Sequence, residues 1–91
     1  MPHTIQDVTK KPVVFIFQLE ITIFTTARIL TMLLERNIEI EEFHFHAMNK
    51  NQGRLMIHCQ LEKDRIGRTA TLLDKLPGVV KLDWMEGKRR L

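Results

Sequence analysis

The sequence predicts an α+β fold in which a four-stranded antiparallel sheet carries two helices on one face. Two tight helix-to-strand turns point to it. A helical pattern ends at Leu76, where Pro77-Gly78 leads directly into an apolar strand, and a similar turn lies at Glu35–Ile38. Proline cannot continue a helix, and glycine accepts the backbone angles of a reversal. A strand-loop-strand pattern lies between the two turns, which gives the ferredoxin-like order β-α-β-β-α-β.

Length and composition limit the class of protein to which this chain can belong. The 91 residues suffice for one domain with a single core. No apolar run approaches the ~20 residues that cross a bilayer, so we expect no membrane partner. A single cysteine excludes an internal disulfide framework and favours a reducing, cytoplasmic location. We expect a flexible arm over residues 1–11, the folded domain over 12–86 and a basic tail over 87–91.

The first strand is predicted at Val13–Leu19, where β-branched and aromatic residues follow Pro12. Apolar residues occupy both of its faces at first, so we expect this strand in the middle of the sheet. Thr22–Thr26 is expected to form a loop in which a threonine caps the first helix. That helix is predicted over Ala27–Arg36, with Asn37 as a left-handed stop.

The predicted first helix is apolar over a wide arc. At ~100° per residue, five apolar side chains sweep about 200° of the helical wheel. Contact with one core needs only about half of that arc. We therefore expect the helix to pack on its own sheet and on a second copy of the chain, as a homodimer through the first helix and a sheet edge. The five residues are Ile29, Leu30, Met32, Leu33 and Leu34.

The second half of the fold is a hairpin, a helix and a last strand. The second strand starts at Ile38, and its apolar set slips from even to odd positions, which predicts a bulge at Glu41-Glu42. Met48–Gly53 is expected to be the hairpin loop. The third strand alternates cleanly, with the odd positions of Leu55–Leu61 on the core face. The second helix is predicted near Asp64–Leu76. The last strand is expected to bury Val80, Leu82 and Trp84.

Three histidines are expected on one face of the hairpin. His44 and His46 share a face of the second strand, and pairing of Met48 with Arg54 would place His58 directly across from His44. Neutral imidazole binds zinc, nickel and copper, so one hypothesis is a free-standing metal-binding or small-molecule-binding module. The other is a polar patch on the face that no helix covers. We favour the patch and assign no metal ligand, because we find no carboxylate or cysteine that completes the set.

We find no catalytic constellation and expect neither enzymatic activity nor a cofactor. Cys59 is flanked by core positions without a base to activate it, so we interpret it as a core residue. Glu41-Glu42 is interpreted as a pair of solvated charges at the end of an element. The sequence has no glycine-rich phosphate loop, nucleophile elbow or metalloprotease spacing. Phe43 and Phe45 are expected to point to the core rather than to stack on bases, which argues against nucleic-acid binding.

Two segments resemble the ACT domain, a small-molecule-sensing module of amino-acid metabolism. The closer resemblance is to the small subunit of acetohydroxyacid synthase (acetolactate synthase). Ala27–Glu41 resembles that family's first helix and second strand, which typically read like S-R-V-I-G-L-F-x-x-R-G-x-N-I-E. Leu73–Leu82 is similar to the end of its second helix and its last strand, L-x-K-L-x-x-V-x-x-V. The whole pattern, from Val13 to Met85, covers about four-fifths of the chain.

The resemblance implies a non-catalytic regulatory subunit of branched-chain amino-acid biosynthesis. Such a subunit is a dimer that binds an amino acid such as valine at its interface and acts allosterically on a thiamine-diphosphate-dependent catalytic large subunit. The effector would lie beside the loop between the first strand and the first helix.

The candidate ligand-binding residues implied by the resemblance are Thr22, Phe24, Thr25 and Glu39. The family has a glycine at the position of Phe24 and an asparagine at that of Glu39. Phe24 adds bulk where the backbone must approach the ligand, and Glu39 adds negative charge near a carboxylate. Both departures argue against conventional binding of a free amino acid.

Overall fold

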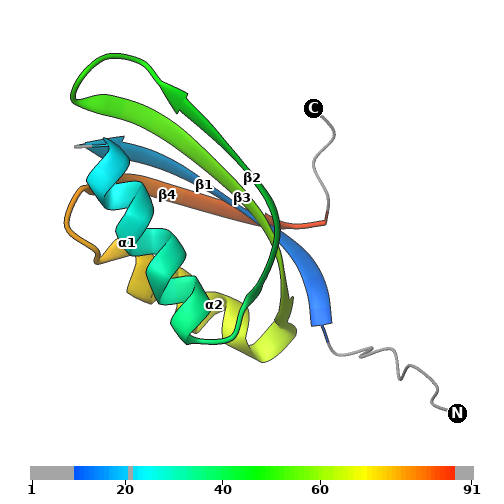
Figure 1. Cartoon of the computed structure of the whole chain (residues 1–91). Helices are drawn as coiled ribbons and strands as arrows, with labels where there is room; N and C mark the ends of the chain where they lie inside the picture. The colour runs from blue at the N-terminus through cyan, green and yellow to red at the C-terminus, as the bar shows by residue number, and fades with distance from the viewer. Residues whose placement is uncertain (1–9, 21, 88–91) are drawn as a thin grey trace, which may run out of the picture.

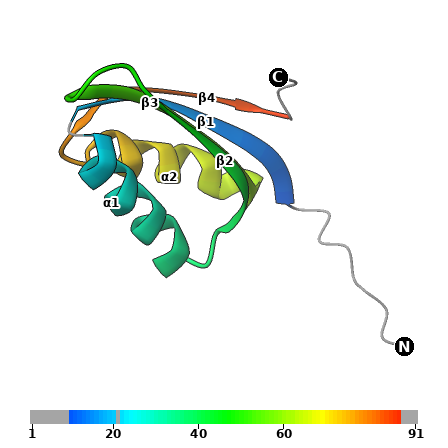
Figure 2. The ribbon, with the colours of Figure 1, turned by 45° about the horizontal axis from the view of Figure 1, so that its top comes forward.

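The computed structural model describes residues 10–20 and 22–87 and confirms the predicted α+β architecture. The elements follow the order β-α-β-β-α-β (Figure 1). They form a four-stranded antiparallel sheet in the order β2-β3-β1-β4, with both helices on one face (Figure 2). Their bounds are β1 Lys10–Glu20, α1 Thr22–Glu35, β2 Glu39–Ala47, β3 Gln52–Glu62, α2 Lys63–Asp74 and β4 Val79–Glu86.

Strand β1 is central, as its two apolar faces predict. It pairs with β3 along its whole length and with β4 from Val13 to Leu19. Val14 is fully buried on the face that carries no helix. Burial on both faces is therefore what places this strand in the middle. The residues that β1 buries toward the helices are Val13, Phe15, Phe17 and Leu19.

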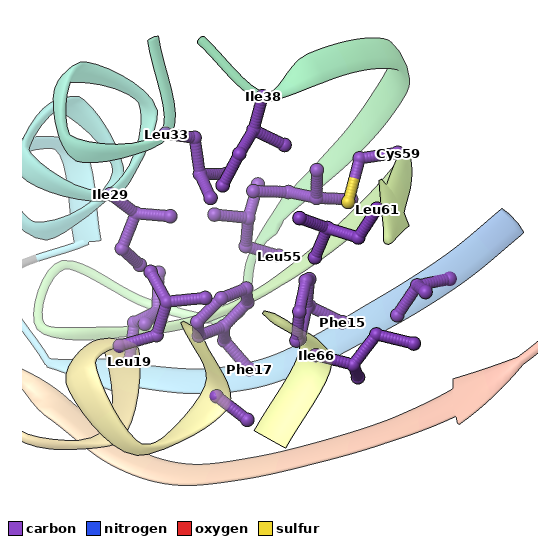
Figure 3. Close-up of a cluster of buried hydrophobic side chains, with 14 residues drawn as sticks. Phe15, Phe17, Leu19, Ile29, Leu33, Ile38, Leu55, Cys59, Leu61 and Ile66 are labelled. Atoms are coloured by element: carbon purple, nitrogen blue, oxygen red, sulfur yellow. The ribbon is translucent and has the colours of Figure 1, made fainter. Parts of the chain in front are cut away.

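The core lies between the sheet and the two helices (Figure 3). Helix α1 contributes Ile29 and Leu33, and α2 contributes Ile66 and Leu73, all fully buried. Each such side chain gains about 1.5–3 kcal/mol on leaving water. Neither α1 nor α2 is long and apolar enough to cross a bilayer. The odd positions of β3 are buried as predicted, and they are Leu55, Ile57, Cys59 and Leu61.

The ends of the domain differ slightly from the expectation. Lys10 and Lys11, expected in the flexible arm, belong to β1. Gly87, the first residue of the predicted basic tail, donates its backbone N–H to the carbonyl oxygen of Pro12 at 2.7 Å. The rest of the predicted arm, 1–9, and of the predicted tail, 88–91, lies outside the described residues.

Helix α1 begins earlier than predicted. Thr22–Thr26, expected as a capped loop, is the first part of the helix. The hydroxyl of Thr25 donates a hydrogen bond to the carbonyl oxygen of Glu20 at 2.6 Å and so ties the helix to the end of β1. Burial of Thr25 and Thr26 outweighs the low helix propensity of threonine. At the other end the prediction is confirmed, because Asn37 has a φ of 58°.

The hairpin between β2 and β3 is tighter than predicted. His46, not Met48, pairs with Arg54, so the predicted register is wrong by two residues. The side-chain carbonyl of Asn49 accepts the backbone N–H of Gln52 at 3.0 Å and closes a shorter turn. A slip of two residues leaves every side chain on its predicted face, because the period of a strand is two.

The predicted bulge at Glu41-Glu42 is confirmed. Ile40 pairs with Cys59 and Glu42 pairs with His58, which leaves Glu41 as the extra residue of β2. A bulge of this kind changes which face the following residues occupy. The apolar residues before and after it therefore stay on the side of the helices.

Strand β4 buries less than predicted. Val80 and Trp84 are exposed, so the expectation that both are buried is wrong, and Leu82 is half-buried. As an edge strand, β4 has a sheet neighbour on one side only. A register irregularity beside Leu19 also leaves Val80 without a partner on β1.

The turn between α2 and β4 requires a glycine. Gly78 has a φ of 94°, and a Cβ there would collide with the side chain of Thr25. We expect Gly78→Ala to lower the free energy of unfolding by about 1–3 kcal/mol, because alanine strains the left-handed backbone. Urea denaturation followed by circular dichroism measures the change.

Gly67 in α2 is the matched control for this substitution. An added Cβ at Gly67 meets nothing within 4 Å, and the residue is exposed. We expect Gly67→Ala to raise the free energy of unfolding by about 0.5–1 kcal/mol, because alanine is the better helix former. Equal effects of the two substitutions would contradict the assignment of the α2–β4 turn.

Candidate functional site

The candidate ligand-binding residues lie at the two ends of helix α1. Thr22, Phe24 and Thr25 are in its first turn, and Glu39 opens β2 beyond its last turn. A helix of 14 residues is about 21 Å long. One chain therefore brings Phe24 and Thr25 together but leaves Glu39 at the opposite end of the helix. The role of all four residues in binding stays a prediction.

A hollow of about 200 Å³ lies at the start of α1, beside the α2–β4 turn. Phe24, Thr25 and Arg28 line it from the helix, and Pro77 and Gly78 line it from the turn. Phe24 is 68% exposed, so its ring lies at the surface rather than in the core. Two of the four candidate residues thus border a real depression of the surface.

The charge of this hollow suits a small anionic group. The first backbone N–H groups of an α-helix have no acceptor within the helix and form the positive end of its dipole. Arg28 adds a guanidinium group to the lining. The negative charge of Glu39, which would oppose a carboxylate, lies away from this hollow within one chain.

Arg28 was not singled out from the sequence alone. With Thr22–Thr26 interpreted as a loop and the helix predicted over Ala27–Arg36, Phe24 and Arg28 belong to different elements. With the helix extended to Thr22, Phe24 and Arg28 are four residues apart on one helix face. The missed signal was therefore the true start of α1.

An exposed apolar stripe runs along α1. Ile23 and Leu34 are 80% and 62% exposed, and Ala27 and Leu30 lie between them at helical spacing. The opposite flank of the helix carries Thr25, which lies against the turn after α2. The stripe therefore faces away from α2 and toward the free edge of β2.

Two phenylalanines of β2 extend this apolar stripe. Phe43 and Phe45 lie opposite Ile57 and Leu55, so they face the side of the helices as predicted. They nevertheless remain 49% and 41% exposed, because β2 is an edge strand. Strand β2 runs back alongside α1 (Figure 1). We call this region the α1–β2 surface; its residues are Ile23, Ala27, Leu30, Leu34, Phe43 and Phe45.

The histidines lie on the opposite face of the sheet, but not in the predicted arrangement. The residue directly across from His58 is Glu42, and His44 is a diagonal neighbour whose ring centroid lies 6.0 Å from that of His58. Nε2 of His44 lies 3.2 Å from Oε2 of Glu42. A donor atom from each of these three residues lies within 4.8 Å of the other two. His46 pairs with Arg54 and is outside this group.

Comparisons with known proteins identify the fold. No family model and no curated protein matches the sequence. Among solved structures, the ACT domain of GTP pyrophosphokinase from Chlorobium tepidum has a TM-score of 0.73 and 14% identity, and the match covers 85% of this chain and 100% of that chain. The C-terminal domain of the MgtC protein from Mycobacterium tuberculosis has a TM-score of 0.69 and 16% identity, and the match covers 91% of this chain and 94% of that chain. An uncharacterised Thermotoga maritima protein has a TM-score of 0.69 and 15% identity, and the match covers 87% of this chain and 99% of that chain. At these identities the likeness establishes the fold, and the chain has a ferredoxin-like, ACT-like fold.

Proposed function

We propose that the protein is a non-catalytic regulatory subunit of the ACT type that acts as a homodimer. The α1–β2 surface is the observation that carries this proposal. Six apolar residues share one side of the domain, and a fully buried large apolar side chain gains about 1.5–3 kcal/mol. Monomeric proteins rarely expose contiguous apolar patches of more than roughly a few hundred Å², and larger patches mark interaction sites. We propose a second copy of the chain as the partner, because a two-fold contact buries this surface on both subunits at once.

A two-fold pair of α1 helices would assemble the candidate residues. When two helices pair antiparallel about a two-fold axis, the start of each lies beside the end of the other. The start of α1 in one copy, with Phe24 and Arg28, would then lie at the same end of the interface as Glu39 of the partner subunit. The candidate residues that lie apart in one chain would meet at the interface.

The assembled site would carry charges complementary to those of a zwitterion. Arg28 and the start of α1 would hold a carboxylate, and Glu39 of the partner subunit would hold an ammonium group. The exposed ring of Phe24 offers an apolar surface to a side chain. We therefore infer that the effector is an amino acid with an apolar side chain, of the branched-chain class.

A regulatory role rather than a catalytic one also suits the single thiol. Burial and, less strongly, the charge of Glu41 raise the pKa of Cys59 to about 12, so this thiol is protonated at neutral pH and unsuited as a nucleophile. A free thiol kept in the core agrees with a reducing compartment such as the cytoplasm.

The first prediction of this proposal concerns the dimer. We expect the wild-type chain to be a dimer at about 10 μM and Leu34→Lys to weaken dimerisation at least about tenfold, because a buried lysine loses its hydration. Sedimentation equilibrium measures both. Val80→Lys is the matched control, since Val80 is similarly exposed on the opposite edge of the sheet. A monomeric wild type, or a variant Leu34→Lys that dimerises like Val80→Lys, would show that the α1–β2 surface has another purpose.

The second prediction concerns the effector. In calorimetric titrations of the dimer with valine, leucine and isoleucine, we expect binding that Arg28→Gln weakens at least about tenfold through loss of a charged hydrogen bond. Arg68→Gln on α2 should leave it unchanged, because Arg68 is exposed and does not line the hollow. Phe24→Gly should also weaken binding, because it removes the apolar surface that the ring offers to the side chain of the effector. An intact dimer that binds none of the three amino acids would remove the effector from the proposal.

The third prediction concerns the partner. Two segments of the sequence resemble small subunits of acetohydroxyacid synthase, so we propose that the catalytic partner is an acetolactate synthase-like, thiamine-diphosphate-dependent enzyme. We expect a tagged chain to co-purify with such an enzyme from its own cells and to raise that enzyme's turnover when added back. If the chain co-purifies with a catalytic subunit of a different class, the proposed partner is wrong, but the proposed homodimer is not affected.

A further inference from the structure

His58 is a buried polar residue that the fold leaves unsatisfied. The residue is 5% exposed, and its Nε2 has no hydrogen-bond partner among the described residues. Its pairing partner on β1 is Val14, which is fully buried and offers no polar group. A buried polar atom without a partner is costly, and native proteins contain few of them. An imidazole therefore occupies a position where an apolar side chain would pack without that cost.

Two side chains that bind metal ions flank this imidazole. Glu42 lies directly across from His58, and His44 lies two residues further along the same face of β2. The bulge at Glu41 is what brings Glu42 to this face. The three residues thus converge from two adjacent strands onto one spot of the helix-free face.

The distances are close to those of a metal site. Two ligands that each lie about 2.1 Å from one zinc ion are about 3.4 Å from each other in a tetrahedral arrangement. The contact between His44 and Glu42 is already 3.2 Å, and the widest separation within the group is below 4.8 Å. Both residues of β2 are exposed, so rotation of their side chains can close the remaining gap.

We propose that Glu42, His44 and His58 form a binding site for a divalent transition-metal ion, with Zn²⁺ as the ion that best fits the donors. Zinc takes imidazole nitrogen and carboxylate oxygen, and three protein ligands leave one position for water. Magnesium and calcium prefer oxygen ligands in larger number. Nickel and copper accept the same donors, so affinity alone does not identify the ion in the cell. An ion bound through Nε2 of His58 would supply the partner that this atom lacks.

This site is separate from the regulatory site proposed above. It lies on the face without helices, whereas the α1–β2 surface lies on the side of the helices. A failure to bind metal would leave the dimer and its effector untouched. A failure to dimerise would likewise leave the metal site standing, because all three ligands come from one chain.

Competition between the full chain and a chromophoric chelator for Zn²⁺ tests the proposal. We expect one ion per chain, with the affinity lowered at least about tenfold in Glu42→Gln and in His44→Ala. His46→Ala and Glu41→Gln are the matched controls, since both residues are exposed neighbours outside the group. Equal loss in the controls, or equal affinity in all variants, would reveal adventitious binding only and overturn the site.

His58 calls for a second measurement because it is buried. We expect His58→Leu to abolish binding of the ion while its melting temperature without metal equals or exceeds that of the wild type, since leucine needs no hydrogen-bond partner. Zn²⁺ should raise the melting temperature of the wild type and not that of His58→Leu. Unchanged zinc binding in His58→Leu would overturn the site. If this variant does not fold, the two exposed ligands decide the question.

Discussion

The pairing of β1 with both of its neighbours is the constraint on which the other elements depend. Strand β1 pairs with β3 through eleven consecutive residues, and its side chains are buried on both faces. Its register decides which side chains of β3 enter the core. A slip of one residue would carry Leu55, Ile57 and Cys59 to the helix-free face and turn His58 toward the helices. The core and the polar cluster are thus two results of one alignment of strands.

The fold could be predicted where local chemistry decides it. The apolar faces of β1, the stop at Asn37 and the bulge near Glu41 follow from side-chain period and turn preference within a few residues. Contacts between different elements decided the rest. The start of α1 depends on the bond from Thr25 to Glu20 in another element. The exposure of β4 depends on the order of strands, which no local pattern of that segment encodes.

The candidate site was predicted in part for the same reasons. Phe24 and Thr25 do line one hollow, but Arg28 was missed because it shares a helix face with Phe24 only when α1 starts before Phe24. Glu42 was interpreted as a solvated charge although the bulge was expected. Combined with that bulge, the period of two places Glu42 on the face of His44. The sequence therefore contained the information that places Glu42 on the same face as His44. Its pairing with His58 became clear only from the register of β2 with β3.

The irregularities of the two edge strands also bear on how the protein avoids aggregation. An open sheet invites other chains to add strands to its free edges, and a long regular edge can seed fibres. In β2 the bulge at Glu41 leaves a regular edge of only Glu42–Ala47, and in β4 the ladder is interrupted at Val80. Each irregularity therefore shortens the regular stretch of edge to which another chain could add a strand. Among the described residues, the insertion that positions Glu42 thus also interrupts the edge of β2, the strand that exposes Phe43 and Phe45.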